Sequence, residues 1–353
     1  SSSFEGSLIL SQVRSSRSAD RLRPPAPLEI PSLPSRFKPR KYLARTPYGE
    51  VVEAFNHDRG ISVALKLLHA DGTHADVARA MFRREVEALK GLSHDAIVQI
   101  LDSFECEDNL LVIELELVPG GLSLRPLFEE VRTGRRARPT LEWRIRMAEK
   151  LAEAVSEAHR RHVIHRDIKP GNVLWNRDED SLKLADFGIA AVLPLTVREQ
   201  PGVTLRSFHT KPFASPEQML QMQPGFPSDV FGFSLLVASL LALREPPEDF
   251  EPEDLRELLA PALSEMAQEA IPEHDVSELA NTLAGGLAHN ADERPSLMQV
   301  RAVLARLAGA LVPRPQAHVG LSKSAQEGLS AAGYIALGKI VEDFNADLRV
   351  RLE

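Results

Sequence analysis

The chain has 353 residues, of which 43% are hydrophobic and 26% are charged, a composition typical of a globular protein that buries a substantial core. It is therefore not globally disordered, and at roughly 100 to 200 residues per domain it can hold one two-lobed domain with tails or two domains. The formal net charge of −8 argues against a protein whose main task is to neutralise nucleic-acid phosphates.

Cysteine content and hydropathy argue against a disulfide-bonded, zinc-binding or membrane-spanning protein. The sequence contains one cysteine, Cys106, and no cluster of Cys and His residues with the spacing of a zinc site. A single cysteine cannot form an internal disulfide, so we expect a reducing, cytoplasmic location. The longest apolar run, residues 234–243, is far shorter than the roughly 20 residues that cross a bilayer. We interpret it as part of a buried helix and expect no membrane segment.

Residues 1–40 are predicted to form an extended, Pro-rich tail. Six prolines lie between residues 21 and 40, too many fixed φ angles and missing N–H donors for a helix or a central strand. Seven basic and three acidic residues give the tail a charge of +4, which leaves −12 for the remainder. Eleven acidic residues and one basic residue lie in residues 245–275, which we interpret as a solvated face in preference to a docking site for a basic partner.

Short strands and one helix are predicted between residues 41 and 117. Residues 61–66 alternate between two faces, as a strand does, whereas residues 77–92 have helical periodicity. Further along, apolar residues keep spacings of three and four, as they do over residues 141–158. Strands followed by helices indicate an α+β protein with two segregated lobes.

We place the β-rich lobe at residues 41–117 and the helical lobe at residues 118–308. Residues 309–353 are expected to form a linker and an amphipathic helix, because apolar residues recur at spacings of three and four between Tyr334 and Leu348. The apolar stripe over residues 334–348 must find a partner surface. It packs back on the core, forms a homodimer or opens a further domain.

The most informative segment runs from His165 to Leu174. It places an acid, a lysine and an amide within six positions, as Asp167, Lys169 and Asn172. The motif Asp186-Phe187-Gly188 follows nineteen residues after Asp167.

Three further segments complete this pattern. They are Val63-Ala64-Leu65-Lys66, Glu85 and Ser215-Pro216-Glu217. In this order and at these spacings the motifs resemble the signature of the eukaryotic-type serine/threonine protein kinases. The resemblance covers roughly residues 41–308. It implies a bilobal protein-kinase-like fold with a small β-rich lobe and a larger helical lobe.

The resemblance also implies an active site that uses ATP and Mg²⁺. Lys66 would hold the α and β phosphates, and Glu85 would fix that lysine by an ion pair. Asp167 would orient the substrate hydroxyl and accept its proton, and Lys169 would steady the γ-phosphate. The structural acid Asp229 would hydrogen-bond the backbone around Asp167.

Asn172 and Asp186 would supply the oxygen ligands that Mg²⁺ prefers. The resemblance further implies a nucleotide pocket lined from both lobes, in which Glu116 and Val118 offer backbone groups to adenine. The implied lining residues are Lys66, Val51, Ala64, Tyr48, Gly49, Glu116, Val118 and Leu174. For the isolated apolar members of this set, a simple core position is an equal alternative.

The Gly-rich phosphate loop departs from the family pattern. It runs from Ala44 to Val51 and keeps only the third glycine, Gly49. Thr46 is β-branched and Pro47 has no N–H to donate, which puts ATP affinity in doubt. We favour an active enzyme over a pseudokinase or nucleotide-binding scaffold, because losing one charge-stabilising donor costs about 10² to 10³ in rate and the charged groups remain.

Arg166 precedes the predicted base, as in family members that are switched by phosphorylation of the activation segment. Thr204 and Ser207 are the candidates for phosphorylation. By its spacing, Thr210 resembles the threonine that contacts Lys169 and the substrate site. Ordinary loop hydroxyls are an equal alternative for these residues.

We therefore predict a protein serine/threonine kinase that transfers the γ-phosphate of ATP to a protein substrate, including itself. Arg294 is expected to be the structural partner of Glu217. A small-molecule kinase of related fold is disfavoured by Lys169 and by the segment that ends in Ser215-Pro216-Glu217, which presents polypeptide substrates in the family that the chain resembles.

Overall fold

The computed structural model describes residues 30, 32–46, 49–70, 75–176, 180–187, 212–220, 222–269 and 271–311. The chain divides into two compact units, residues 1–311 and 312–353, and every described residue belongs to the first. The predicted helix at residues 334–348 lies outside the described residues.

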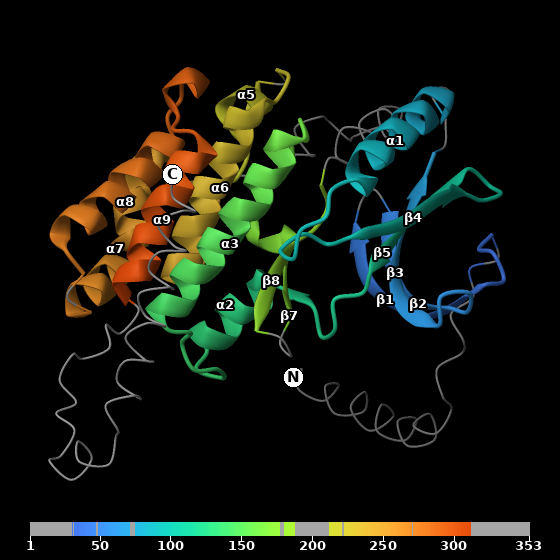
Figure 1. The fold of residues 1–353 in the computed structure, drawn as a ribbon, viewed down its shortest axis with the longest axis horizontal. Helices are drawn as coiled ribbons and strands as arrows, with labels where there is room; N and C mark the ends of the chain where they lie inside the picture. The colour runs from blue at the N-terminus through green and yellow to red at the C-terminus, as the bar shows by residue number, and fades with distance from the viewer. Residues whose placement is uncertain are drawn as a thin grey trace, which may run out of the picture. The chain divides into compact units, whose positions relative to one another are not determined.

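The β-rich lobe is an antiparallel sheet of five strands in the order β1-β2-β3-β5-β4, with helix α1 packed against it (Figure 1). The bounds are β1 Phe37–Thr46, β2 Gly49–Asn56, β3 Ile61–His69, α1 Ala75–Lys90, β4 Ile100–Glu105 and β5 Leu110–Glu116. Alternation along β3 sends Val63 and Leu65 into an outer apolar cluster. Lys66 lies on the opposite face, toward the helical lobe.

The structured region begins before residue 41, where we had expected the tail to end. Strand β1 starts at Phe37, and Ile30 and Leu33 pack on the outer apolar cluster of the sheet. Proline does not prevent this, because β1 is an edge strand and its register shifts between Pro39 and Lys41. The last part of the predicted tail therefore belongs to the small lobe.

The helical lobe is built around α6, which is buried along nearly its whole length. Its elements are α2 Leu124–Arg132, α3 Leu141–Arg160, α5 Pro216–Met219, α6 Phe226–Ala242, α7 Leu255–Gln268, α8 Glu273–Gly286, α9 Leu297–Leu311, and the short 3₁₀ helices η1 Pro170–Asn172, η4 Pro252–Asp254 and η5 Ala291–Glu293. Helix α6 confirms that the apolar run 234–243 belongs to a buried helix. Among the described helices, none is long and apolar enough to cross a membrane.

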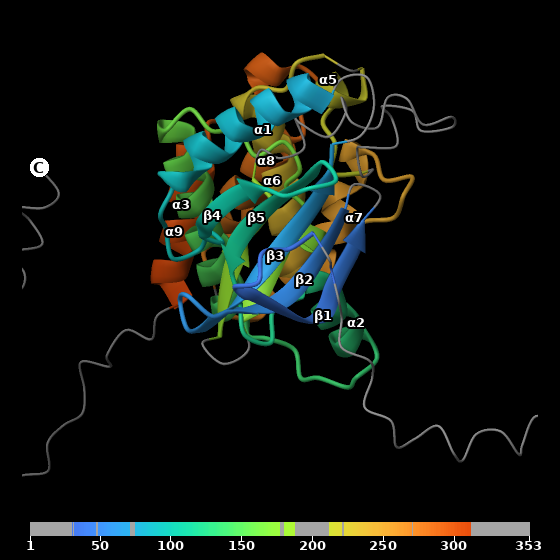
Figure 2. The same ribbon diagram turned by 90° about the vertical axis from the view of Figure 1, so that its right-hand side faces the viewer.

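A three-stranded sheet connects the two lobes. Its strands, in the order β6-β7-β8, are β6 Leu122–Ser123, β7 Val173–Asn176 and β8 Ser181–Leu184. Leu184 accepts a hydrogen bond from Val98 N–H at 2.9 Å and donates its own N–H to Ala96 at 2.8 Å, so β8 is joined to the segment that leads into β4. Figure 2 shows the five-stranded sheet in front of the helical lobe, with α1 above the strands.

Candidate active site

The loop of residues 165–172, between α3 and β7, is organised by His165, whose side chain is fully buried. Its Nδ1 accepts a hydrogen bond from Asp167 N–H at 3.2 Å, so its Nε2 carries the proton and donates to the carbonyl of Ala185 at 2.9 Å. Burial lowers the pKa of His165 below its ordinary value. His165 is therefore a neutral, packed histidine, as expected from the sequence, and it ties the loop to the residue before Asp186.

Asp229, in the first turn of α6, holds the backbone of this loop. Its carboxylate is 1% exposed and accepts hydrogen bonds from the N–H groups of His165 and Arg166, each at 2.8 Å. Arg166 has a φ of 72°, and a left-handed conformation at a non-Gly residue costs on the order of 1 to 3 kcal/mol. The structural role predicted for Asp229 is confirmed, because its two hydrogen bonds hold the strained backbone just before Asp167.

Asp167, Lys169 and Asn172 form one contact group. The Nζ of Lys169 lies 2.7 Å from Oδ2 of Asp167. The Nδ2 of Asn172 donates to the same Oδ2 at 2.9 Å and to the backbone carbonyl of Asp167 at 2.8 Å. Two donors thus fix one oxygen of the Asp167 carboxylate and orient the other.

The β7–β8 hairpin brings Asn172 next to Asp186. Val173 pairs with Leu184, so the residues just outside the hairpin face each other, and Ala185 donates its N–H to the carbonyl of Asn172 at 2.8 Å. Asp186 has a φ of 65°, a second left-handed residue at this site. The register of this hairpin therefore places Asn172 and Asp186, which both carry side-chain oxygens, close together.

Lys66 reaches this group from β3. Its Nζ forms an ion pair with Oδ1 of Asp186 at 2.8 Å, although the two residues are 120 positions apart. The Lys66 side chain is 9% exposed, and that of Asp186 is 35% exposed. Burial alone would raise the pKa of Asp186, but the ammonium groups of Lys66 and Lys169 hold it below its ordinary value. Asp186 is therefore ionised at neutral pH.

Several predicted residues lie outside the described part of the chain. Glu85 falls within α1, but its side chain lies outside the described part of the structure, as do Tyr48 and three candidate regulatory residues. Those candidates are Thr204, Ser207 and Thr210.

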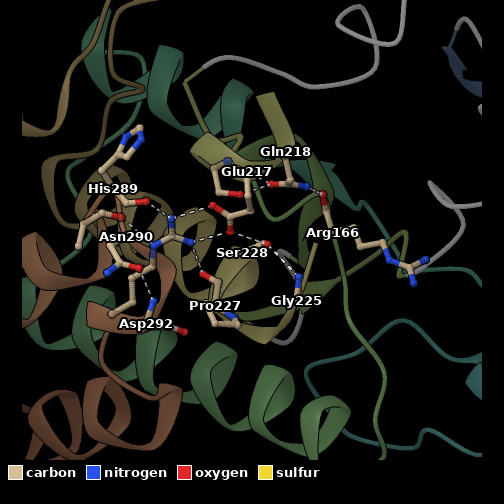
Figure 3. Close-up of polar contacts among 12 residues, drawn as sticks. Arg166, Glu217, Gln218, Gly225, Pro227, Ser228, His289, Asn290 and Asp292 are labelled. Carbon is tan, nitrogen blue, oxygen red and sulfur yellow. Dashed lines mark hydrogen bonds and ion pairs between the residues drawn. The ribbon is translucent and has the colours of Figure 1, made fainter. Parts of the chain in front are cut away.

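Behind the loop, Glu217 and Arg294 form a two-point ion pair. NH1 of Arg294 lies 2.8 Å from Oε1 of Glu217, and NH2 lies 2.8 Å from Oε2 (Figure 3). NH1 also donates to the carbonyl of Pro227 at 2.9 Å, and Ser228 Oγ donates to Glu217 at 2.7 Å. Burial alone would raise the pKa of Glu217, but the hydrogen bonds from Arg294 and Ser228 lower it from 4.5 to about 2. The predicted partnership is confirmed.

The family model of the protein kinase domain matches residues 39–303 of this chain. The chain belongs to the protein kinase domain family.

Curated relatives of this kinase domain are much longer than the chain. A probable serine/threonine-protein kinase SCO3848 of Streptomyces coelicolor is 33% identical over 220 residues, which are 61% of this chain and 31% of that protein. Serine/threonine-protein kinase PrkC of Bacillus subtilis is 32% identical over 184 residues, or 52% of this chain and 27% of that protein. The chain thus spans under a third of the length of these relatives.

A solved structure confirms the fold of the kinase domain. The crystal structure of the Mycobacterium tuberculosis PknI kinase domain matches with a TM-score of 0.58 and 20% sequence identity. The match covers 79% of this chain and 100% of that chain. At this identity the similarity establishes the fold alone.

Asn172 and Asp186 fit a magnesium ion by the chemistry of their donors. Because Nδ2 of Asn172 is used by Asp167, the amide presents its other atom, Oδ1, as a ligand. Asp186 supplies an ionised carboxylate. Mg²⁺ commonly takes one or two such protein ligands and completes its shell with phosphates and water.

The described nucleotide-lining residues of the kinase domain lie in β2, β3 and β5 of the five-stranded sheet, in β7 of the smaller sheet, and just after β5. Val51 pairs with Lys66 across β2 and β3, and Ala64 pairs with Leu115 across β3 and β5. Leu174 lies in β7, where it pairs with Ser123 of β6. The remaining lining residues, Gly49, Glu116 and Val118, lie at the start of β2, at the end of β5 and just beyond β5.

Sequence reasoning missed two contacts of the site. Lys183 in β8 donates from Nζ to Oε1 of Glu116 at 2.8 Å, and that oxygen also accepts Gln99 N–H at 2.9 Å. The second contact joins Gln218 to Arg166. A Ser-x-x-Gln pattern at Ser215 signals the helix cap that contains Gln218, but no pattern signals that Lys183 meets Glu116.

Proposed function

We propose that this chain is the catalytic domain of a protein serine/threonine kinase that uses ATP and Mg²⁺. The observation that carries the proposal is the contact group of Asp167, Lys169 and Asn172, together with the ion pair between Lys66 and Asp186. Phosphoryl transfer depends on positioning and on cations aimed at the phosphates, which these side chains can provide. The curated relatives bear the name serine/threonine-protein kinase, which supports a hydroxyl acceptor on a protein.

The proposed reaction begins at Oδ1 of Asp167, the carboxylate oxygen that Lys169 and Asn172 do not hold. This carboxylate accepts the proton of a Ser or Thr hydroxyl as the hydroxyl oxygen bonds to the γ-phosphorus of ATP, while the bond from that phosphorus to the β–γ bridging oxygen breaks and ADP leaves. Lys169 and Asn172 hold the other oxygen of Asp167, which keeps the accepting oxygen in place. Asn172 and Asp186 would hold Mg²⁺, which would supply positive charge to neutralise the phosphates.

Lys66 has two partners in this proposal. In the structure, its ammonium group is paired with the Asp186 carboxylate at 2.8 Å. With nucleotide, the α and β phosphates offer Lys66 a stronger negative partner, which leaves the Asp186 carboxylate for the metal. Glu85 would steady Lys66 from α1, as the family resemblance implies.

Transfer of labelled γ-phosphate tests this function. The chain, incubated with ATP and Mg²⁺, is expected to label itself and a generic basic protein on Ser or Thr. Asp186→Ala and Asp167→Asn should each reduce labelling at least about a hundredfold, because charge stabilisation or the proton acceptor is lost. Asp249→Asn, at an exposed acidic position of the helical lobe, is the matched control and should label normally. Labelling that persists in Asp186→Ala rejects the proposal, and absent labelling in the parent favours the nucleotide-binding scaffold.

Regulation, assembly and location extend the proposal. We propose that Thr204 or Ser207, and not Thr210, is phosphorylated, which mass spectrometry after incubation with ATP and Mg²⁺ would detect.

The apolar stripe over residues 334–348 would mediate a homodimer or join a further domain. Size-exclusion chromatography with and without residues 314–353 separates a dimer from the other possibilities. The single cysteine supports a reducing, cytoplasmic location.

A further inference from the structure

A glutamine from α5 reaches the loop that carries Asp167. Gln218 is 3% exposed, and its Nε2 donates to the backbone carbonyl of Arg166 at 2.7 Å. Figure 3 shows this contact, with the side chain of Arg166 pointing away from the glutamine. A residue just after the Ser-Pro-Glu motif thus touches the main chain immediately before the proposed base.

Ser215 fixes which way the Gln218 amide points. Both the backbone N–H and the Oγ of Ser215 donate to Oε1 of Gln218, each at 3.1 Å. With its oxygen held by Ser215, the amide must present its NH₂ group to Arg166. Ser215 therefore orients the side chain that contacts the Arg166 carbonyl.

The contact acts on one particular peptide group. The carbonyl of Arg166 and the N–H of Asp167 belong to the same planar unit. Gln218 holds that carbonyl, and Nδ1 of His165 accepts that N–H at 3.2 Å. Both the carbonyl and the N–H of this peptide are therefore hydrogen-bonded, which fixes the direction in which the Asp167 side chain leaves the backbone. Arg166 itself is left-handed, with a φ of 72°, so this backbone would relax if one support were removed.

We propose that Gln218 is a positioning residue for phosphoryl transfer, oriented by Ser215 and acting through the Arg166–Asp167 peptide. The inference rests on the proposed kinase function. It also makes α5 a direct support of the proposed base. Arg294 anchors the neighbouring Glu217, so α5 is fixed to the helical lobe on one side and to the loop on the other.

The chain supplies a matched control. Ser296 and Gln299 form the same cap at the start of α9, with Ser296 N–H and Oγ donating to Gln299 Oε1 at 2.7 and 2.9 Å. This second cap is exposed and makes no described contact with the loop. Replacing its glutamine removes an equivalent cap without touching Asp167.

Steady-state kinetics of Gln218→Met and Gln299→Met test the inference. Gln218→Met should lower kcat about tenfold to a hundredfold through misplacement of Asp167, with the KM for ATP changed less than about threefold. Gln299→Met should keep the parent kcat. A parent-like kcat in Gln218→Met, or an equal loss in both variants, would overturn the inference.

A second variant addresses misfolding. Gln218→Glu keeps the shape but places a carboxylate against the Arg166 carbonyl. When that acid is protonated it regains a donor, so the ratio of variant to parent kcat should rise as the pH falls. A ratio that does not change with pH overturns the inference.

Hydrogen exchange separates this inference from the proposed function. Amide exchange of the segment 163–169 should be faster in Gln218→Met than in the parent and in Gln299→Met. If the parent transfers no phosphate, the proposed function fails, while faster exchange still supports the positioning role and unchanged exchange rejects it.

Discussion

Glu217 and Arg294 are 77 residues apart in the chain and meet in a two-point ion pair with both N···O distances at 2.8 Å. The Arg294 side chain is fully buried, and it also donates to the carbonyls of Pro227 and Ala288. Removing this buried guanidinium would leave the Glu217 carboxylate without its cation and without the hydrogen bonds from Arg294. The pair therefore fixes α5 to the start of α6 and to η5.

Arg294→Met should lower the free energy of unfolding by about 3 to 5 kcal/mol, because it leaves the Glu217 carboxylate without its cation. Urea unfolding at pH 7 measures this change. Arg306→Met is the control, since Arg306 pairs with Glu278 at the surface and should contribute less than about 1 kcal/mol. Equal losses in the two variants would contradict the importance of the buried pair.

Acid should weaken the same pair. Glu217 has a pKa of about 2 in the folded chain against 4.5 as its ordinary value, so its stabilisation is complete above about pH 4.5 and is lost as the pH falls toward 2. The stability gap between the parent and Glu217→Gln should therefore be constant from pH 7 to 5 and should narrow below pH 4.5. Urea unfolding across this range checks the sign, and a gap that widens in acid would refute it.

Much of the fold follows from periodicity. Alternation over residues 61–66 and helical spacing over 141–158 correspond to β3 and α3, because side chains on a half-buried element must follow its geometry. The ion-pair partner of Glu217 was also predictable, since a family motif names it.

Other features depend on contacts that no local pattern encodes. Six prolines over residues 21–40 indicated a tail, yet the edge strand β1 tolerates Pro39, and Ile30 and Leu33 pack on the apolar cluster of the sheet. The pair of Lys183 with Glu116 joins β8 to the end of β5, two strands that alternation alone does not place side by side. Tertiary packing decides such contacts, so sequence spacing cannot reveal them.

The ion pair between Lys183 and Glu116 should affect nucleotide affinity. The Nζ to Oε1 distance is 2.8 Å, and the pair ties the segment proposed to bind adenine to the strand that leads to Asp186. Lys183→Met should raise the KM for ATP about threefold to tenfold, the range that a lost hydrogen bond of about 1 kcal/mol allows, and should leave kcat within about twofold.

Charge reversal sharpens this test. Combining Lys183→Glu with Glu116→Lys should restore part of the lost ATP affinity, whereas either single reversal should not. Lys90→Met is the control, because Lys90 forms a more exposed ion pair with Asp102 at 3.5 Å. A KM that rises equally in the control would assign the effect to general destabilisation.

The phosphate loop, residues 44–51, spans the end of β1 and the start of β2. β1 ends at Thr46 and β2 begins at Gly49, and these two residues pair across the strands. Gly49 must remain glycine, because its φ is 153° and an added Cβ would overlap the carbonyl oxygen of Leu67.

Thr46 and Pro47 stand at loop positions where the sequence departs from the family pattern. Combining Thr46→Gly with Pro47→Ser supplies an N–H donor and removes a β-branched side chain beside it, so we expect the KM for ATP to fall about tenfold, as one hydrogen bond to a charged phosphate allows. Initial rates against ATP concentration measure this, with Asp58→Ser in the turn after β2 as the control. An unchanged or raised KM would mean that the loop holds ATP through other groups and is already adapted to do so.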